Sequence, residues 1–414
     1  MREYKFINKC RLCNSKDLLK VINFGKIPLG NNFSLKKNES HFAKLFPLEL
    51  NFCKKCRHCQ LSISVNPSIL YQKNYTYLSS IGSSFIEHFN NYYLWILKKT
   101  KIPNNSLILD VGSNDGTCLS FFKKKFKVCG IDPATKPVKI ANRNNIYTVN
   151  NFLNDKSSKK ILNKFGKFDL ITSHNVLAHV DDINNVFFLI YRMLKNNGYF
   201  CFEVGYFLKV IKNNFFDTIY HEHLDYHNAQ SMVKFLYNYN FSIINISTNK
   251  AQGGSIRFLC RKLPKKKISN QVLNFIKKEK NTNLINLINL KKWNTQIDLQ
   301  IERLKEIINQ YYIKNKIIVG YGAPTKATLW IKFLELNSKK IKFVVEDNNL
   351  KINKFFPKTD IKIVEINKLL SCKIDLIIIF AWNFKKDIIK KLKKMKIKNV
   401  NIITPLPNLI KNRL

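Results

Sequence analysis

The sequence lacks any uninterrupted apolar run of the roughly 18–20 residues that a membrane-spanning helix needs. Its opening stretch, MREYKFINKC, lacks the apolar core of a secretory signal. Acidic residues are scarce, because 27 aspartates and glutamates stand against 71 lysines and arginines, for a formal net charge of +44. No aromatic stacking motif of the RNA-recognition type accompanies this charge. We therefore expect a soluble, cytoplasmic protein without membrane contact.

The excess positive charge is spread along the whole chain. Lysine-rich runs such as PKKKIS and KKLKKMK recur among stretches rich in Asn and Ile, as A/T-rich coding would produce. Dispersed lysines of this kind form solvated faces and attract anionic substrates. We expect an anionic small-molecule partner and no nucleic acid, although an RNA-modifying enzyme would use the charge directly. The oligomeric state is left open.

Three regions of the chain differ in their pattern. The length of 414 residues and the hydrophobic fraction of 45% allow two or three domains. Residues 1–75 hold a cysteine cluster and short apolar pieces separated by Gly, Pro and Asn. Residues 76–262 alternate helices with β-rich strands, and residues 263–414 contain a helical connector and a second α/β unit. Such alternation is typical of a doubly wound parallel sheet. We predict an α/β protein with a small N-terminal zinc module, a doubly wound central sheet and a Rossmann-like C-terminal domain.

The strands of the two α/β regions are predicted from their apolar runs. In the middle region they are SLILDVG, KVCGIDP, NIYTVNN, FDLITSHN and GYFCFEVG, preceded by an amphipathic helix over 83–100. FSIINIST and SIRFLCRK, joined by a short loop, are expected to pair antiparallel. The last region contributes KIIVGYG, KIKFVVED and DLIIIFAW.

The N-terminal cysteines have the spacing of a metal site. Cys10 and Cys13 form one CxxC pair, and Cys53 and Cys56 form another about 40 residues later. Two such pairs can close a tetrahedral Zn²⁺ site, and four thiolates leave no place for water, so the zinc would be structural. Cys59 is a possible fifth ligand, but it opens a strand-like run and is expected to be packed. A redox CxxC is less favoured because no thioredoxin-like pattern surrounds it.

The segment LILDVGSNDGTCLSFF predicts a strand, a glycine turn and a helix start. Gly112 and Gly116 allow close approach of a ligand to the backbone, and Asp110 lies at the strand end. The next strand ends at Asp132, where a doubly wound fold places a carboxylate on ribose hydroxyls. The turn is not GxGxxG, which disfavours a nicotinamide cofactor without excluding it.

These elements resemble motifs I and II of class I methyltransferases. Over nearly its whole length the chain resembles the NDP-sugar C-methyltransferase family, exemplified by the 3-C-methyltransferases that build branched deoxysugars. The resemblance is carried by CRHCQL, DVGSNDGT, HNVLAHV, DTIYHEHLDYH, QGGSIRF, GYGAPTKAT and AWNF. It implies S-adenosylmethionine as the cofactor. The residues expected to bind it are Asp110, Gly112, Asn114, Asp115, Gly116, Asp132, Pro133, Phe152 and Asn175.

Methylation of carbon needs a carbanion-like nucleophile, and a hydrogen beside a ketone is the accessible one to remove because the resulting enolate spreads its charge onto oxygen. The protein must then supply a base and a polar group at the enolate oxygen. By resemblance, His223 and Tyr220 are the catalytic pair, with His223 as the base. Glu222 would orient or polarise the histidine, and His179 matches another polar position of the family's active site. A lone histidine is more often structural, but histidines and tyrosines are dense in this segment. A metal site built on His221 and His223, with Glu222 and Asp225, is the rival functional interpretation.

The resemblance also implies a nucleotide-sugar substrate. The residues expected to contact it are Tyr75, Tyr77, Gly253, Gly254 and Lys326. A helix N-terminus with Lys326 suits a diphosphate, although a plain turn with a solvated lysine is equally compatible. FFPKTDIKIV departs from the family's usual turn, which leaves nucleotide contacts there open. We predict a C-methyltransferase acting beside the ketone of a nucleotide-linked keto-deoxysugar. The alternatives are a zinc-ribbon RNA methyltransferase and a non-catalytic S-adenosylmethionine-binding protein.

Overall fold

A computed structural model describes residues 3–71, 78–407 and 409–414. The chain forms two compact units, and neither is a continuous stretch of sequence. The first comprises Met1–Leu19, Asn51–Leu208 and Glu222–Asn286, and the second comprises Lys20–Leu50, Lys209–His221 and Leu287–Leu414. Among the described residues, no helix combines the length and apolar character needed to cross a bilayer.

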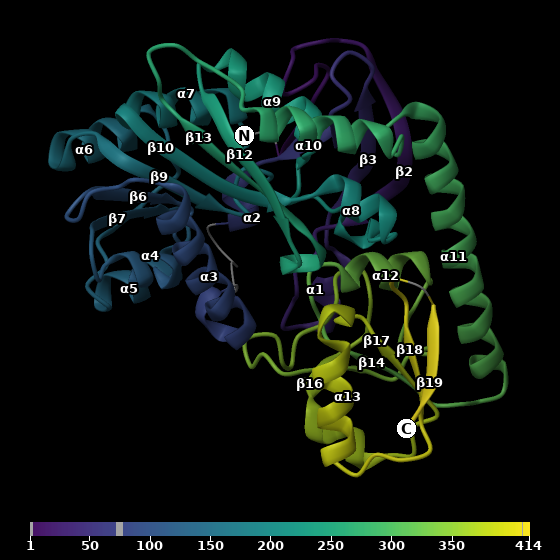
Figure 1. Ribbon diagram of the computed structural model, residues 1–414. Coiled ribbons are helices and arrows are strands. Elements are labelled where there is room, and N and C mark those ends of the chain that lie inside the picture. The colour runs from purple at the N-terminus through teal and green to yellow at the C-terminus, as the bar shows by residue number, and fades with distance from the viewer. Residues whose placement is uncertain (1–2, 72–77, 408) are drawn as a thin grey trace. The chain divides into compact units, whose positions relative to one another are not determined.

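The first unit is built on a seven-stranded sheet with the order β12-β13-β10-β9-β6-β7-β8 (Figure 1). Its strands are β6 (Leu107–Val111), β7 (Lys127–Asp132), β8 (Thr148–Asn150), β9 (Phe168–His174), β10 (Leu194–Gly205), β12 (Ser242–Asn249) and β13 (Ser255–Arg261). β6 to β10 pair in parallel, whereas β13 runs antiparallel to both β10 and β12. The predicted doubly wound sheet is confirmed, as is the antiparallel pair at its end.

Helices cover both faces of this sheet. Figure 1 shows α3 (Ser83–Lys99), α4 (Thr117–Phe122) and α5 (Thr135–Arg143) on one face, and α6 (Asp155–Phe165), α7 (Ile183–Met193) and α9 (Ala229–Asn238) on the other. Apolar side chains of α3 and α4, among them Tyr92, Ile96 and Phe122, pack with strand residues such as Ile108 in one buried cluster. A further helix, α10 (Asn270–Asn281), follows β13. The strand order reverses between β6 and β9, and a doubly wound sheet binds ligands beyond the carboxyl ends of the strands at that point.

The cysteine-rich region contains more strand than its sequence led us to expect. β1 (Tyr4–Phe6) pairs antiparallel with β5 (Ile63–Val65), and a four-stranded sheet has the order β11-β4-β3-β2. Its strands are β2 (Leu18–Pro28), β3 (Leu45–Cys53), β4 (Cys59–Leu61) and β11 (Asp225–Tyr226). Along β3, Phe46, Leu48, Leu50 and Phe52 are buried in alternation. This period of two is the strand signal that the division into short apolar pieces overlooked. Two short helices, α1 (Lys37–His41) and α2 (Pro67–Tyr71), complete this region.

The second unit holds a six-stranded sheet with the order β16-β15-β14-β17-β18-β19. The strands are β14 (Ile318–Tyr321), β15 (Val344–Glu346), β16 (Ile363–Glu365), β17 (Leu376–Ile379), β18 (Asn401–Thr404) and β19 (Ile410–Arg413). They are parallel except for β19. Three of them are the predicted KIIVGYG, KIKFVVED and DLIIIFAW. The helices are α11 (Leu287–Ile313), α12 (Ala327–Phe333) and α13 (Lys385–Lys394), and the chain passes from the first unit to the second within α8 (Phe207–Lys212).

Candidate active site and zinc site

The two CxxC pairs come together in the first unit. Sγ of Cys10 lies 3.5 Å from that of Cys56, and Sγ of Cys13 lies 3.6 Å from that of Cys53. All four sulfur atoms are within 4.8 Å of one another. Four zinc–sulfur bonds of about 2.3 Å require sulfur separations of about 3.8 Å, so this donor set fits a tetrahedral zinc ion. Cys59 is fully buried at the start of β4 and is not part of the cluster.

The glycine turn after β6 is shaped by packing as well as by backbone conformation. Gly112 has φ +76°, and a Cβ at this position would come within 2.1 Å of Cγ2 of Val176, in the loop that follows β9. Gly116 has φ +80° and precedes the first turn of α4. Gly112 therefore lets the loops after β6 and β9 come together at the reversal of strand order, where the sequence predicted the cofactor.

Two buried carboxylates lie at the carboxyl ends of β6 and β7. Asp110 accepts a hydrogen bond from the Thr172 hydroxyl at 2.7 Å. Asp132 accepts from the backbone N–H groups of Asn114 at 2.9 Å and Ala134 at 2.8 Å. Burial raises the pKa of Asp110 to about 7 and that of Asp132 to about 6. Within the described part of the chain neither carboxylate forms an ion pair, so this edge offers acceptor oxygens that suit a cationic, hydroxyl-bearing ligand such as S-adenosylmethionine.

The remaining predicted cofactor residues lie around this turn. The Asn114 side chain accepts from the N–H of Ser79 at 3.0 Å, and the Asp115 carboxylate accepts from the N–H of Ser80 at 3.0 Å. The turn thus fixes η1 (Ser79–Ile81), the short helix before α3. Pro133, Phe152 and Asn175 follow the ends of β7, β8 and β9, respectively, and each is half-buried. All of the predicted cofactor residues therefore lie at the carboxyl ends of the strands of one sheet or in the loops that follow them.

His179 and His223 lie next to each other in the first unit, with ring centroids 4.8 Å apart. Nδ1 of His179 is 2.7 Å from the carbonyl oxygen of Glu222 and 3.2 Å from the Tyr71 hydroxyl, which itself donates to the same carbonyl. Burial lowers the pKa of His179 to about 4, so its imidazole is neutral at pH 7. Its Nδ1 hydrogen then points to Glu222, which leaves Nε2 as an acceptor.

Tyr220 belongs to a segment of the second unit that is anchored on both sides. Three residues earlier, the fully buried Asp217 accepts hydrogen bonds from the indole N–H groups of Trp330 at 3.0 Å and Trp382 at 2.6 Å. One residue later, Nε2 of His221 bonds the backbone carbonyls of Phe46 and Pro47 at 3.3 and 3.2 Å. These contacts set the backbone on either side of Tyr220.

The alternative of a metal site on His221 and His223 is not supported. Among the described residues, the groups with metal-ligand spacing are the four-cysteine cluster and a trio of His88, His174 and Glu203. Neither contains His221 or His223. In the trio, Glu203 is bound by His88 at 2.7 Å and by Arg257 at 2.7 and 2.9 Å. Because an arginine already balances the carboxylate, a second cation is disfavoured there.

The predicted substrate residues lie in different surroundings. Lys326 is buried at the start of α12, with Nζ 3.8 Å from a carboxylate oxygen of Asp217, 3.3 Å from Oδ1 of Asn383 and 3.6 Å from the Trp382 ring centroid. The alternative of a solvated lysine therefore does not hold. Gly253 and Gly254 form the turn between β12 and β13, both with positive φ. Tyr75 and Tyr77 lie outside the described residues.

Sequence reasoning missed several residues of this region. Tyr71, the last residue of α2, contacts His179, whereas the tyrosines singled out in the sequence were Tyr75 and Tyr77. The buried Glu203–Arg257 pair was also missed, although Arg257 belongs to the GGSIR element. Charged residues in otherwise apolar strands were the available signal, because a fully buried charge is rare without a partner.

Comparison with known proteins assigns a family domain to each part of the chain. Residues 10–71 match a zinc binding domain, residues 87–246 a methyltransferase domain and residues 250–407 the C-methyltransferase C-terminal domain. Together with the fold and the sulfur cluster, these matches place the chain among the S-adenosylmethionine-dependent C-methyltransferases with a structural zinc site. The chain is 26% identical over 403 residues to the C-methyltransferase NovU of Streptomyces niveus. This match covers 97% of this chain and 96% of that protein.

Solved structures are similar to less than half of the chain. A S-adenosylmethionine-dependent methyltransferase from Clostridium acetobutylicum is 14% identical, covers 42% of this chain and 91% of its own, and has a TM-score of 0.35. Magnesium protoporphyrin IX methyltransferase from Synechocystis, with bound S-adenosylhomocysteine, is 14% identical, covers 42% and 82%, and has a TM-score of 0.33.

Proposed function

We propose that this enzyme methylates a carbon next to the ketone of a nucleotide-linked keto-deoxysugar, by forming an enolate that then accepts the methyl group. The observation that carries the proposal is the imidazole pair of His223 and His179, the latter in the loop that follows β9. A proton on carbon next to a ketone is weakly acidic, and a positioned imidazole is the usual base for such a step. The resemblance of the YHEH and GGSIR elements to the NDP-sugar C-methyltransferases supports this choice of substrate.

His223 is the proposed base, and the state of His179 favours it. When His223 takes up the substrate proton it becomes positively charged. A second charged imidazole with its centroid 4.8 Å away would oppose this step, but burial lowers the pKa of His179 to about 4 and keeps it neutral. The Nδ1 hydrogen of His179 is directed at the Glu222 carbonyl, so its ring orientation is fixed. His179 can therefore contact the polar sugar or the imidazolium without competing for the proton.

Tyr220 and Glu222 complete the proposed catalytic set. We assign to Tyr220 the stabilisation of the enolate oxygen through its hydroxyl, because a hydrogen bond that strengthens as charge develops accelerates the step. Anchoring of Asp217 and His221 limits the backbone freedom of Tyr220. Glu222 contributes its carbonyl to His179 and, in this proposal, its carboxylate to the polarisation of His223.

S-adenosylmethionine supplies the methyl group when it is bound. The proposed cofactor residues are those at the carboxyl edge of the seven-stranded sheet, with Asp132 on the ribose hydroxyls. Gly253 and Gly254 are the proposed contacts to the sugar nucleotide. The contact between Lys326 and the substrate diphosphate stays a prediction, and it requires the Lys326 ammonium to leave Asp217 and bind phosphate instead. The cytoplasmic location also stays a prediction.

The experiment separates proton removal from methyl transfer. A nucleotide keto-deoxysugar is incubated in deuterium oxide with the enzyme and S-adenosylhomocysteine, which cannot methylate, and mass spectrometry follows deuterium at the α carbon. In His223→Ala the exchange should fall by on the order of 10²–10⁴, the usual contribution of a positioned base. Cofactor affinity, measured by calorimetry, should stay within about twofold.

His41→Ala provides the matched control, because His41 is an exposed histidine at the end of α1. Exchange at the parental rate in His223→Ala would assign the base to another group, with His179 next in line. If the parent neither exchanges nor methylates any keto sugar offered, the substrate class is wrong.

A further inference from the structure

The zinc-binding loops also carry a buried charged residue that reaches the active-site loops. Arg11 lies between Cys10 and Cys13 and is 8% exposed. Its Nε donates to both carboxylate oxygens of Asp225, at 2.9 and 3.0 Å. The peptide around Arg11 is fixed as well, because its N–H donates to the Gln60 side chain at 2.8 Å and its carbonyl accepts from Asn184 at 3.0 Å. Arg11 is therefore a buried, hydrogen-bonded residue of the zinc-binding loop and not a solvated side chain.

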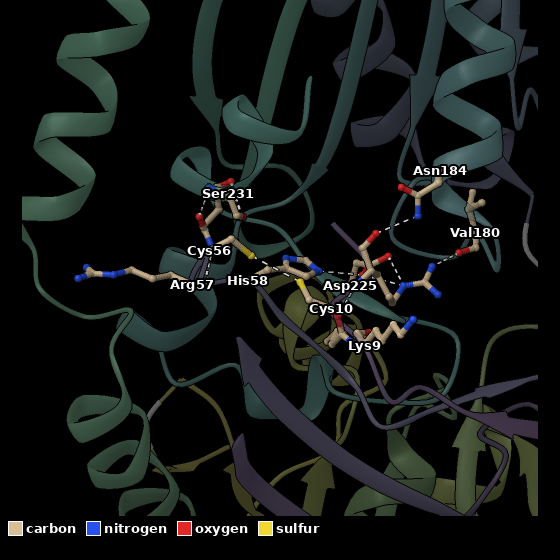
Figure 2. Close-up of polar contacts among 12 residues, drawn as sticks. Lys9, Cys10, Cys56, Arg57, His58, Val180, Asn184, Asp225 and Ser231 are labelled. Atoms are coloured by element: carbon tan, nitrogen blue, oxygen red, sulfur yellow. Dashed lines mark hydrogen bonds and ion pairs between the residues drawn. The ribbon is translucent and has the colours of Figure 1, made fainter. Parts of the chain in front are cut away.

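A residue just after the second CxxC pair contacts the same carboxylate. His58 follows Cys56 by two positions, and its Nε2 lies 2.8 Å from Oδ1 of Asp225 (Figure 2). The side chains of His58 and Asp225 are fully buried. Each CxxC pair thus supplies one partner to Asp225, and the geometry of these partners depends on the loops that the metal closes.

Asp225 follows His223 by two residues, and the chain between them is bonded on both sides. The N–H of Leu224 donates to the carbonyl of Ala178 at 2.7 Å, and the carbonyl of Leu224 accepts from Leu61 at 2.9 Å. β11, which begins at Asp225, pairs with β4, the strand after the second CxxC pair. The backbone that carries His223 is consequently an extension of the zinc module's sheet.

Arg11 also hydrogen-bonds the backbone just after His179, the other member of the imidazole pair. Its terminal guanidinium nitrogens donate to the carbonyl of Val180 and, at 3.0 Å, to that of Asp181. Val180 is adjacent to His179. One buried guanidinium therefore links the segment of His179 with the segment of His223, and both links start from a residue between two zinc ligands.

We propose that the zinc site positions the His179–His223 pair through Arg11, His58 and Asp225, in addition to holding the N-terminal module together. Arg11 and Asp225 are positioning residues, since their polar atoms bind protein groups rather than the reacting atoms. The catalytic consequence rests on the proposed role of His223. The structural link does not, and it can be measured without substrate.

The structural part is tested by hydrogen exchange and mass spectrometry on the full chain. Removal of zinc with a chelator should speed exchange in peptides covering residues 177–182 and 222–228, because the N–H of Leu224 loses the support of the Arg11 network. Arg11→Met should speed exchange in the same two peptides while retaining one zinc per chain, since all four cysteines remain. Arg261→Met is the matched control, because Arg261 also bonds a backbone carbonyl, that of Asn197 at 3.0 Å, in the same unit.

The catalytic part uses the same variants. Arg11→Met and Asp225→Asn should lower kcat for methylation by about 10–100-fold, the usual effect of losing a group that orients a site residue. KM for S-adenosylmethionine should change less than twofold, and Arg11→Lys should recover part of the rate. A general loss of folding would instead lower active-enzyme content and zinc content together.

The outcomes separate the two proposals. Unchanged exchange in both peptides, in zinc-free protein and in Arg11→Met, overturns the positioning role. Faster exchange with an unchanged kcat overturns the catalytic consequence. A parent enzyme that fails to act on keto sugars overturns the proposed function, while the exchange measurement still decides whether the zinc site holds these loops.

Discussion

Two glycine turns, one in each unit, begin from the same local pattern and end in different chemistry. Each follows a buried parallel strand, β6 in the first unit and β14 in the second, and in each an acid at the end of the neighbouring strand binds the turn. Asp132 accepts from the N–H of Asn114 at 2.9 Å, and Glu346 accepts from that of Ala323 at 2.7 Å. The acid that ties the turn to the sheet is therefore common to both.

The two turns differ in the cationic side chains beside them. The first turn is flanked by Asp110 and Asp132, with no protein cation paired to either among the described residues. At the second, Nζ of Lys351 donates to the Ala323 carbonyl at 2.8 Å, and Lys326 is buried against Asp217. The second turn is occupied by side chains of its own unit, whereas the first keeps acceptor oxygens for a ligand. A glycine turn after a strand thus indicates a fold, and the neighbouring charges decide what it binds.

The largest expected effect concerns the acids of the two turns. Asp132→Ala should weaken S-adenosylmethionine binding by roughly 10²-fold or more, because two charge-assisted hydrogen bonds of about 1.5–3 kcal/mol each are lost. Glu346→Ala should leave the affinity unchanged, and titration calorimetry measures both. Asp132→Asn keeps one acceptor oxygen, so its affinity for S-adenosylmethionine should lie between those of the parent and Asp132→Ala. Parental affinity in Asp132→Ala would show that this carboxylate serves the turn alone.

The next effect tests whether Lys326 is part of the packing. Lys326→Met leaves Asp217 without its cationic neighbour, and removal of one partner of a buried pair costs about 3–5 kcal/mol of unfolding free energy. The double variant with Asp217→Asn should be more stable than Lys326→Met, since no unpaired charge remains. Denaturant unfolding measures both. If Lys326→Met is as stable as the parent but binds the sugar nucleotide weakly, the lysine serves the substrate instead.

The smallest effect is a difference in pH dependence between the two turns. Burial raises the pKa of Asp110 to about 7 and lowers that of Lys326 to about 8. The folded, cofactor-free protein then binds more protons than the unfolded chain between about pH 4 and 7, so stability falls as pH rises there. At Lys326 the folded protein binds fewer protons than the unfolded chain between about pH 8 and 10.5, so stability rises with pH in that range. Each group contributes at most about 1.4 kcal/mol per pH unit.

Variants isolate these slopes from those of other groups. Asp110→Asn should flatten the dependence of the unfolding free energy only in the acidic window, and Lys326→Met only in the alkaline one. Slopes that match the parent in both variants would mean that folding shifts the pKa of neither group.

Much of the fold could be predicted because its signals are local. The glycine turn, the strands on either side and the two CxxC pairs are each contained in a short stretch of sequence. β2 and β3 were missed although β3 alternates buried and half-buried residues, because glycines and prolines suggested interruptions. The cysteine cluster was predictable since metal chemistry restricts ligand type and spacing.

The candidate site was harder to predict because its contacts are long-range. Arg11 and Asp225 are 214 positions apart, and no periodicity or motif connects them. Tyr71 was passed over in favour of tyrosines a few residues later, because sequence alone does not say which turn of chain faces His179. The role of Lys326 depends on Asp217 and Trp382, which lie in distant segments. Pairings of this kind are decided by tertiary packing.

The division of the chain into interleaved pieces affects the order in which the protein can fold during synthesis. Met1–Leu19 and Glu222–Asn286 belong to one unit, so the first piece waits for about 200 residues before its last partner is made. The four zinc cysteines all precede position 57 and can collect the metal early. Arg11 must remain without Asp225 until the methyltransferase sheet is nearly complete. A fragment that carries residues 76–262 alone would therefore lack the partner of Asp225, and expression of the whole chain is the sound route to an active enzyme.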